Sequence, residues 1–298
     1  MSGSDGAFAV GTARHPWFPS SPCGTGCLAG REALVGRARR WWRLTAVVFV
    51  VLLSLLLLVV LPVVGSRGRE WVARSVFRSV LLAMGVRLEV SGRDALGARG
   101  RGVLVVNNHT SWLDIVAVNA VRPMRAMAKK DIASWPVLGW LVSAAGSVYV
   151  RREGLRDLPG TVAELADVLR GGSMVNVTPE GTTWCGLTHG RFRPAMFQAA
   201  IDGGVPVLPV ALRFRMKADG AQTTAPAFIG EETIIDSVRR VAALRGLVLE
   251  VHVLEELAPG RAADRHELAA MAEAAVDTVL LPSPAEHERL ADAELQRR

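Results

Sequence analysis

Cysteine is scarce in this sequence, and the shortage argues against two kinds of site. Only three of the 298 residues are cysteines, Cys23, Cys27 and Cys185. Their spacing matches neither a set of zinc ligands nor a disulfide framework, which favours a reducing compartment. We therefore predict no metal site and no bound cofactor, and we expect none of the three thiols to have a role in the fold.

Lysine and aromatic residues are also scarce. The formal net charge is +7, yet only Lys129, Lys130 and Lys217 are lysines, so arginine carries nearly all of the positive charge. A basic chain can bind nucleic acid, an anionic membrane or a phosphorylated substrate. Aromatic residues make up 6% of the chain and do not alternate with the basic runs, which argues against nucleic acid. The overall excess of arginine also fits a biased composition, so we interpret only local clusters of charge.

Charge is absent from one long segment near the N-terminus. Residues 44–64, LTAVVFVVLLSLLLLVVLPVV, contain no charged side chain. As a helix, such a run of about 21 residues spans about 31 Å, which matches the hydrocarbon core of a bilayer. A signal peptide is the alternative, but the run is long, begins only at Leu44 and lacks a small-residue cleavage site. We predict a flexible leader over 1–36 and an uncleaved membrane anchor within 37–85.

Two features of the anchor stay open at the level of sequence. Arginines lie on both sides of the apolar run, so the positive-inside rule does not fix its orientation, and a helix that re-enters the membrane fits as well as one that spans it. The following segment, 69–86, places Val72, Val76 and Val80 on one helical face and Arg74 on the other. This pattern fits an amphipathic helix in the headgroup layer or a surface helix packed on the domain.

The rest of the chain alternates between strand and helix patterns, which predicts an α/β fold. We expect a mixed, largely parallel sheet flanked by helices over 86–282, followed by a polar tail over 283–298. Helices are expected from Ser111 and over 158–170. The expected strands are 86–92, 102–107, 147–150, 173–177, 205–212 and 247–254. In such a sheet the loops that leave the strand ends carry the chemistry.

The loop after the strand 102–107 contains Asn108, His109 and Asp114. Ser111 and Asp114 fit a Ser-x-x-Asp capping box at the start of a helix, which would turn the carboxylate back toward the imidazole of His109. A carboxylate bound to one ring nitrogen fixes the tautomer and leaves the other nitrogen free to accept a proton. The pattern predicts a general base, although the same residues could serve only to cap the helix.

Other strand ends hold groups that suit one reaction. Arg151 and Arg152 end one strand, the run 179–181 (Pro-Glu-Gly) follows another, and the apolar run 204–210 begins a third. A base, a cationic clamp, a carboxylate and an apolar wall together favour acyl transfer to a phosphorylated alcohol.

Four blocks in this order make the chain resemble the 1-acylglycerol-3-phosphate acyltransferase family from about Val86 to Arg215. The first block, N-H-x-x-x-x-D, is matched by Asn108, His109 and Asp114. The second, a glycine, a short apolar strand and an arginine, is matched by residues 146–152. The third is usually F-P-E-G-T-R and is matched by residues 179–182, with threonine at 178 and 183. The fourth, V-P-V-x-P-V, is matched by residues 205–210.

The resemblance implies a role for each block. His109 would be the base and Asp114 its orienting partner, and Asn108 would contact the substrate. The acceptor would be bound by Glu180, Gly181 and Thr182. Its phosphate would be bound by Arg152 and secondarily by Lys129. Val205, Pro206 and Pro209 would line the acyl region. Since Thr183 replaces the family arginine, Arg193 or Arg191 would restore the lost charge, or both simply face solvent.

The implied function is transfer of a fatty acyl group to a lyso-glycerophospholipid, foremost 1-acylglycerol-3-phosphate, giving phosphatidic acid. The donor would be acyl-CoA or acyl carrier protein, the partner surface a lipid bilayer, and the location the cell membrane with the catalytic domain on its cytoplasmic side. The missing arginine keeps another acceptor open, such as lyso-ornithine lipid. A metal-dependent hydrolase using His109, Asp114 and Glu180 and a membrane-tethered binding protein are the alternatives of other classes.

Overall fold

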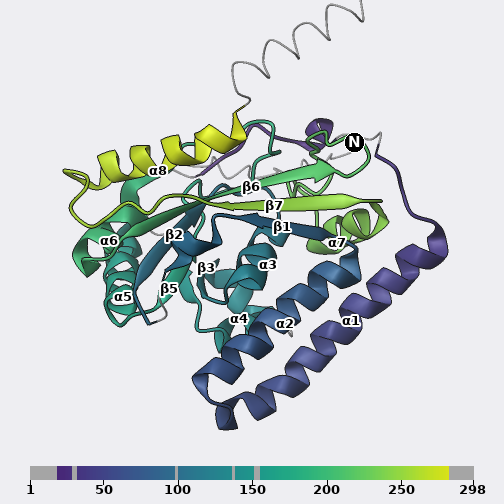
Figure 1. Ribbon diagram of the computed structural model, residues 1–298, viewed down its shortest axis with the longest axis horizontal. Coiled ribbons are helices and arrows are strands. Elements are labelled where there is room, and N and C mark those ends of the chain that lie inside the picture. The colour runs from purple at the N-terminus through teal and green to yellow at the C-terminus, as the bar shows by residue number, and fades with distance from the viewer. Residues whose placement is uncertain (1–18, 29–31, 98–99, 136–137, 151–154, 282–298) are drawn as a thin grey trace, which may run out of the picture.

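The computed structural model describes residues 19–28, 32–97, 100–135, 138–150 and 155–281 (Figure 1). The predicted polar tail and the first half of the predicted leader lie outside the described residues. One sheet with helices on both faces organises the described chain, which confirms the predicted α/β class.

The sheet has seven strands in the order β1-β7-β6-β2-β5-β3-β4. All neighbouring pairs are parallel except β6 and β7, which are antiparallel, so the sheet is mixed and largely parallel as predicted. Its strands are β1 (Arg87–Ser91), β2 (Val103–Asn107), β3 (Arg125–Lys129), β4 (Val148–Val150), β5 (Met174–Val177), β6 (Val207–Met216) and β7 (Leu247–Val253).

Two hydrophobic cores lie on the two faces of this sheet. Strand β2 contributes to both, because its alternate side chains point to opposite faces. Val103 and Val105 pack in one core, with α2 (Ser66–Met84), α3 (Trp112–Val121) and α7 (Ile234–Ala243). Leu104 and Val106 pack in the other, with α5 (Leu158–Arg170), α6 (Phe197–Gly203) and α8 (Arg265–Leu280). Every β2 residue is buried, as expected of a central parallel strand.

The predicted membrane segment forms the first arm of a helical hairpin, α1 (Arg37–Val60), which lies antiparallel to α2 (Figure 1). Helix α1 is long and apolar enough to cross a bilayer, and little of it is buried. Its first turns are fixed to the domain, because Arg43 donates to the carbonyl oxygens of Ala242 (3.1 Å) and Leu244 (2.7 Å) at the end of α7. A short helix α4 (Leu138–Ala144) also contacts α1.

The second arm packs on the domain. Leu81 and Met84 of α2 are buried in the core, and the Arg78 Nε donates to the Ala120 oxygen of α3 at 3.1 Å. Of the two interpretations of this segment, the helix packed on the domain therefore describes its inner face. Trp71 and Leu82 remain exposed on the outer side.

Most predicted elements are present. The helix predicted over 158–170 has those bounds, and six predicted strands occur with shifts at their ends, of which the largest is four residues at the end of β6. Strand β3 and the helices α4, α6, α7 and α8 were not predicted.

Candidate active site

The candidate site lies where β2 and β5 end. These strands are parallel neighbours, so their carboxyl ends meet at one edge of the sheet. His109 follows β2 by two residues and Glu180 follows β5 by three. The two loops are joined, because the backbone N–H of His109 donates to Glu180 Oε2 at 3.1 Å. The backbone N–H of Trp184 donates to the His109 oxygen at 2.8 Å.

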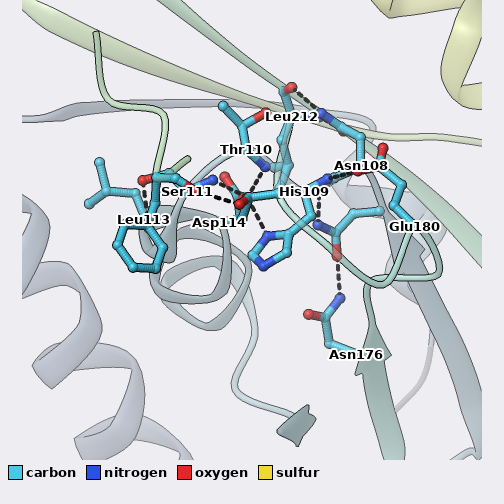
Figure 2. Close-up of polar contacts among 12 residues, drawn as sticks. Asn108, His109, Thr110, Ser111, Leu113, Asp114, Asn176, Glu180 and Leu212 are labelled. Carbon is cyan, nitrogen blue, oxygen red and sulfur yellow. Dashed lines mark hydrogen bonds and ion pairs between the residues drawn. The ribbon is translucent and has the colours of Figure 1, made fainter. Parts of the chain in front are cut away.

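The predicted pair of His109 and Asp114 is present. The His109 Nδ1 lies 2.9 Å from Asp114 Oδ2, and in Figure 2 the ring and the carboxylate point toward one another. The imidazole side chain is 17% exposed, whereas the carboxylate is fully buried. With Nδ1–H donated to Asp114, the neutral ring keeps the lone pair of Nε2 for a substrate proton.

The capping box fixes where this carboxylate lies. Ser111 caps α3, and Asp114 at the third helical position turns back toward the chain before the helix. Its Oδ2 accepts the backbone N–H groups of Thr110 (2.7 Å) and Ser111 (2.8 Å) in addition to His109. Capping and orientation of the imidazole are therefore performed by the same oxygen, so the two interpretations of the pattern hold together.

Asn108 joins the catalytic loop to β6. This side chain is buried, its amide nitrogen donates to the Leu212 oxygen (2.9 Å), and its side-chain oxygen accepts the Leu212 N–H (2.8 Å) (Figure 2). Because both ends of the amide are paired with the backbone of β6, Asn108 holds the catalytic loop on the sheet, and its contact with substrate stays a prediction.

Glu180 is buried behind the loop, and burial raises the pKa of its carboxyl well above the ordinary value. The hydrogen bond from the His109 N–H opposes this rise in pKa, and the neighbouring Asp114 charge adds to it. The backbone N–H of Gly190 lowers the pKa of this carboxyl as well, and its second oxygen, Oε1, is buried. The carboxyl thus braces the catalytic loop.

The rest of the third block forms a tight turn beside Glu180. Gly181 has a φ of +76°, a conformation that favours glycine. Thr183, which replaces the family arginine, donates its hydroxyl to the Phe228 oxygen. The exposed Arg193 passes close to Gly181, since a Cβ on that glycine would lie 3.8 Å from the Arg193 Cδ. The side chain of Arg193 therefore passes beside the block, and Thr182 is partly exposed.

The fourth block lies elsewhere. Val205 and Pro206 precede β6, where Pro206 accepts a hydrogen bond from the N–H of Leu104 near the start of β2. Because β2 and β6 run parallel, these two residues lie at the sheet edge opposite to His109. Pro209 is buried within the strand, opposite Val106. That Val205, Pro206 and Pro209 line the acyl region stays a prediction, and the three contribute to the sheet before and within β6.

Arg152 and Lys129 are the predicted phosphate contacts. Arg152 and Arg151 lie outside the described residues, and Lys129 is the last residue of β3. Strand β3 pairs with β5 and β4, so the backbone of residue 129 lies toward the same sheet edge as the ends of β2 and β5.

One contact was not foreseen. The side-chain amide of Asn176 on β5 donates to the Asn107 Oδ1 at 2.6 Å. The side-chain amide of Asn107 in turn donates to the backbone oxygen of Asn108 at 2.6 Å, and all three residues are buried. The only signal in the sequence is a polar residue near the end of each of two apolar strands. This amide chain fixes the ends of β2 and β5 relative to each other.

The geometry disfavours the hydrolase alternative. His109, Asp114 and Glu180 do not gather as a set of three ligand atoms, and among the described residues the three cysteines alone form such a set. Asp114 Oδ2 already accepts three N–H groups. The arrangement is that of a base with an orienting carboxylate.

Known proteins resemble this chain in sequence and in fold. A model of the acyltransferase family matches residues 87–213. The 1-acyl-sn-glycerol-3-phosphate acyltransferase of Neisseria meningitidis is 38% identical over 193 residues, which cover 64% of this chain and 73% of the relative. The lyso-ornithine lipid O-acyltransferase of Pseudomonas aeruginosa is 34% identical over 227 residues, which cover 76% and 83%.

A solved structure has the same architecture. The crystal structure of the 1-acyl-sn-glycerophosphate acyltransferase of Thermotoga maritima superposes with a TM-score of 0.61 and 18% identity, covering 82% of this chain and 93% of that one. At this identity the likeness concerns the fold.

Proposed function

The chain belongs to the acyltransferase family, and from that premise we propose that it moves a fatty acyl group from an acyl thioester to the hydroxyl of a lyso-lipid. One observation carries the proposal above all. The imidazole of His109 is held by a fully buried carboxylate, 2.9 Å away, at the sheet edge where two parallel strands end.

The reaction needs one base and no resident cofactor. Nε2 of His109 removes the proton of the acceptor hydroxyl as its oxygen forms a bond to the thioester carbonyl carbon. Asp114 stabilises the imidazolium that results, as an orienting carboxylate does. The carbon–sulfur bond then breaks, and the proton passes from His109 to the leaving thiolate. General-base catalysis of this kind contributes about 10²- to 10⁴-fold to the rate.

The acceptor is proposed to lie over the β5 loop. Glu180 braces this loop, the partly exposed Thr182 offers a hydroxyl to the acceptor, and Arg193 supplies positive charge beside Gly181. 1-Acylglycerol-3-phosphate is the first candidate, in keeping with the name of the Neisseria relative. Lyso-ornithine lipid is the second, because Thr183 places a neutral hydroxyl where the family motif has arginine and because the Pseudomonas relative is named for that acceptor.

The hairpin of α1 and α2 is proposed to seat the domain on the bilayer. The face of α1 turned away from α2 exposes large apolar side chains, among them Phe49, Leu52, Leu56 and, near its start, Trp41 and Trp42. Tryptophan at the ends of such a face is typical of the membrane interface. Because α1 packs on α2 and α2 packs on the domain, we favour a hairpin embedded in one leaflet over a free span. Acyl-CoA or acyl carrier protein would then reach the site from the cytoplasm.

The test is an acyltransferase assay on membranes that contain the full chain. Radiolabelled acyl-CoA, or acyl carrier protein charged with the same acyl group, is supplied with 1-acylglycerol-3-phosphate or lyso-ornithine lipid, and the labelled diacyl product is measured. The His109→Ala variant should lose about 10²- to 10⁴-fold in kcat, because only the base is removed. Asp114→Asn should fall in the same direction, since the amide no longer favours the tautomer with a free Nε2.

His252→Ala serves as the matched control, because this imidazole pairs with Ser91 and Glu250 on β1 and β7, at a distance from the catalytic loop along the sheet. It should retain the activity of the wild type. Full thioester-dependent activity in the His109→Ala variant would refute the assignment of the base, and product from neither acceptor would refute the proposed substrate class.

A further inference from the structure

The three cysteines, which the sequence left without a role, come together in the structure. Cys23 and Cys185 are buried, Cys27 is partly buried, and all three are free thiols. Their sulfur atoms all lie within 4.8 Å of one another. Zn–S bonds of about 2.3 Å in a tetrahedral site place two sulfur ligands about 3.8 Å apart, so a small inward movement of these side chains closes a coordination shell.

The backbone brings the thiols in from two separate parts of the chain. Cys23 precedes and Cys27 ends a single 3-10 turn, Thr25–Cys27, so the C-x-x-x-C spacing presents two sulfur atoms on one side. Cys185 comes from the loop that follows β5. Apolar side chains surround the cluster, namely Ala227, Ile229, Leu28 and Trp184. An apolar shell around a metal site limits its access to solvent.

A hydrogen-bonding group lies beside two of the three sulfur atoms. The Thr188 hydroxyl lies 3.7 Å from the Cys185 sulfur and 4.0 Å from that of Cys23. Hydrogen-bond donors of this kind are the usual outer contacts of a metal-bound thiolate.

We propose that Cys23, Cys27 and Cys185 form a three-thiolate site for a thiophilic divalent cation such as Zn²⁺, with water as the fourth ligand. Three thiolates select soft or borderline cations over Mg²⁺ or Ca²⁺. Each thiol releases its proton when the cation binds, so the affinity rises with pH.

The site fastens the N-terminal segment to the loop of the catalytic centre. Pro19 packs on Gly181, and Trp184, next to Cys185, donates its backbone N–H to the His109 oxygen. A cation at the cysteines therefore ties residues 19–28 to the loop that braces His109. It would stabilise the folded state by mass action without taking part in the acyl transfer.

The experiment titrates the reduced, chelator-stripped full chain with Zn²⁺ and, in parallel, with Co²⁺. We expect one equivalent of Zn²⁺ to bind and Co²⁺ to give sulfur-to-metal charge-transfer absorption. Each single Cys→Ser variant should weaken Zn²⁺ binding by about tenfold or more, and the triple variant should abolish it. Arg191→Ser, which is exposed on the same loop, is the matched control and should bind as the wild type does.

A second measurement needs no variant, which keeps the proposal testable if a substitution impairs folding. Zn²⁺ should slow alkylation of all three thiols in the wild-type chain. Failure of one equivalent of Zn²⁺ to bind the reduced chain would overturn the proposal. So would undiminished binding by the triple variant, or a disulfide between two of the cysteines in freshly isolated protein kept free of oxidant.

Discussion

At the scale of single residues, the buried carboxyl of Glu180 links the stability of the fold to pH. Its folded-state pKa is raised well above the ordinary value, chiefly by burial. Between those two pKa values the folded chain binds more protons than the unfolded chain, so stability falls as pH rises through that window. The slope from one such group is at most about 1.4 kcal/mol per pH unit.

Glu180→Gln should remove this slope, because the amide is neutral at every pH and its oxygen can still accept the His109 N–H. The free energy of unfolding, measured from pH 5 upward in the same detergent, should favour the variant over the wild type by a margin that grows with pH. Parallel curves for the two proteins would contradict the raised pKa.

Asp264→Asn is the control for that series. Asp264 caps α8, and hydrogen bonds from the N–H groups of Glu267 and His266 lower the pKa of its carboxyl. The ionised Asp264 stabilises the fold fully above the pKa that its carboxyl has in the unfolded chain. This contribution is lost as the pH falls through the lower pKa that the carboxyl has in the folded chain. Across the range from pH 5 upward, this variant should therefore differ from the wild type by a constant amount.

The candidate site could be predicted at this scale only where the contacts are local. His109 and Asp114 meet because the Ser-x-x-Asp box forms within one turn of helix, which the spacing alone specifies. The role of Asn108 depends on Leu212, which lies 104 positions further along the chain. The brace from Glu180 and the cysteine cluster depend in the same way on loops that only the complete fold brings together.

At the scale of elements, the joint between α2 and β1 holds the hairpin in place. Gly85 ends α2 with a φ of +69°, and a Cβ built there would lie 2.1 Å from Arg43 Nη2. The same arginine caps the end of α7. One small residue thus allows α1, α2 and α7 to converge.

Gly85→Ala should lower the free energy of unfolding by about 1–3 kcal/mol, from the positive φ together with displacement of the Arg43 guanidinium. Thermal unfolding in detergent provides the measurement. Gly204→Ala is the matched control: Gly204 also ends a helix at positive φ (+62°), but an added Cβ there meets no described atom within 4 Å. The loss should be larger at Gly85, and equal losses would show that the contact with Arg43 contributes nothing.

Elements with a strong local pattern were predictable, and the others show where such patterns fail. The helix over 158–170 has an apolar stripe and a Gly-Gly stop, and its bounds were confirmed. Strand β3, RAMAK, has no apolar alternation and owes its conformation to pairing with β4 and β5. Helices α7 and α8 do carry a local signal in the sequence, since Thr233 and Asp264 cap their starts.

At the scale of the whole molecule, the exposed apolar face of α1 should govern attachment to membranes. Burying a leucine side chain is worth about 1.5–3 kcal/mol. The double change Leu52→Asn with Leu56→Asn should therefore weaken partition to phosphatidylglycerol vesicles by at least about tenfold in a flotation assay.

Leu187→Asn is the control for partition, because this leucine is 64% exposed and Leu56 is 65% exposed, but it lies on the loop after β5. It should partition as the wild type does. Unchanged partition of the double variant would contradict the proposed seating of the hairpin.

The strand order also dictates when the pieces can join as the polypeptide leaves the ribosome. β1 stands at the border of the described sheet beside β7, which is the last strand to be translated. Helices α1 and α2 emerge first, so the exposed apolar face of α1 can bind lipid while β1 still lacks its partner strand β7. If translation stops before residue 247, the fragment should therefore bind the bilayer through α1 although its sheet lacks β7.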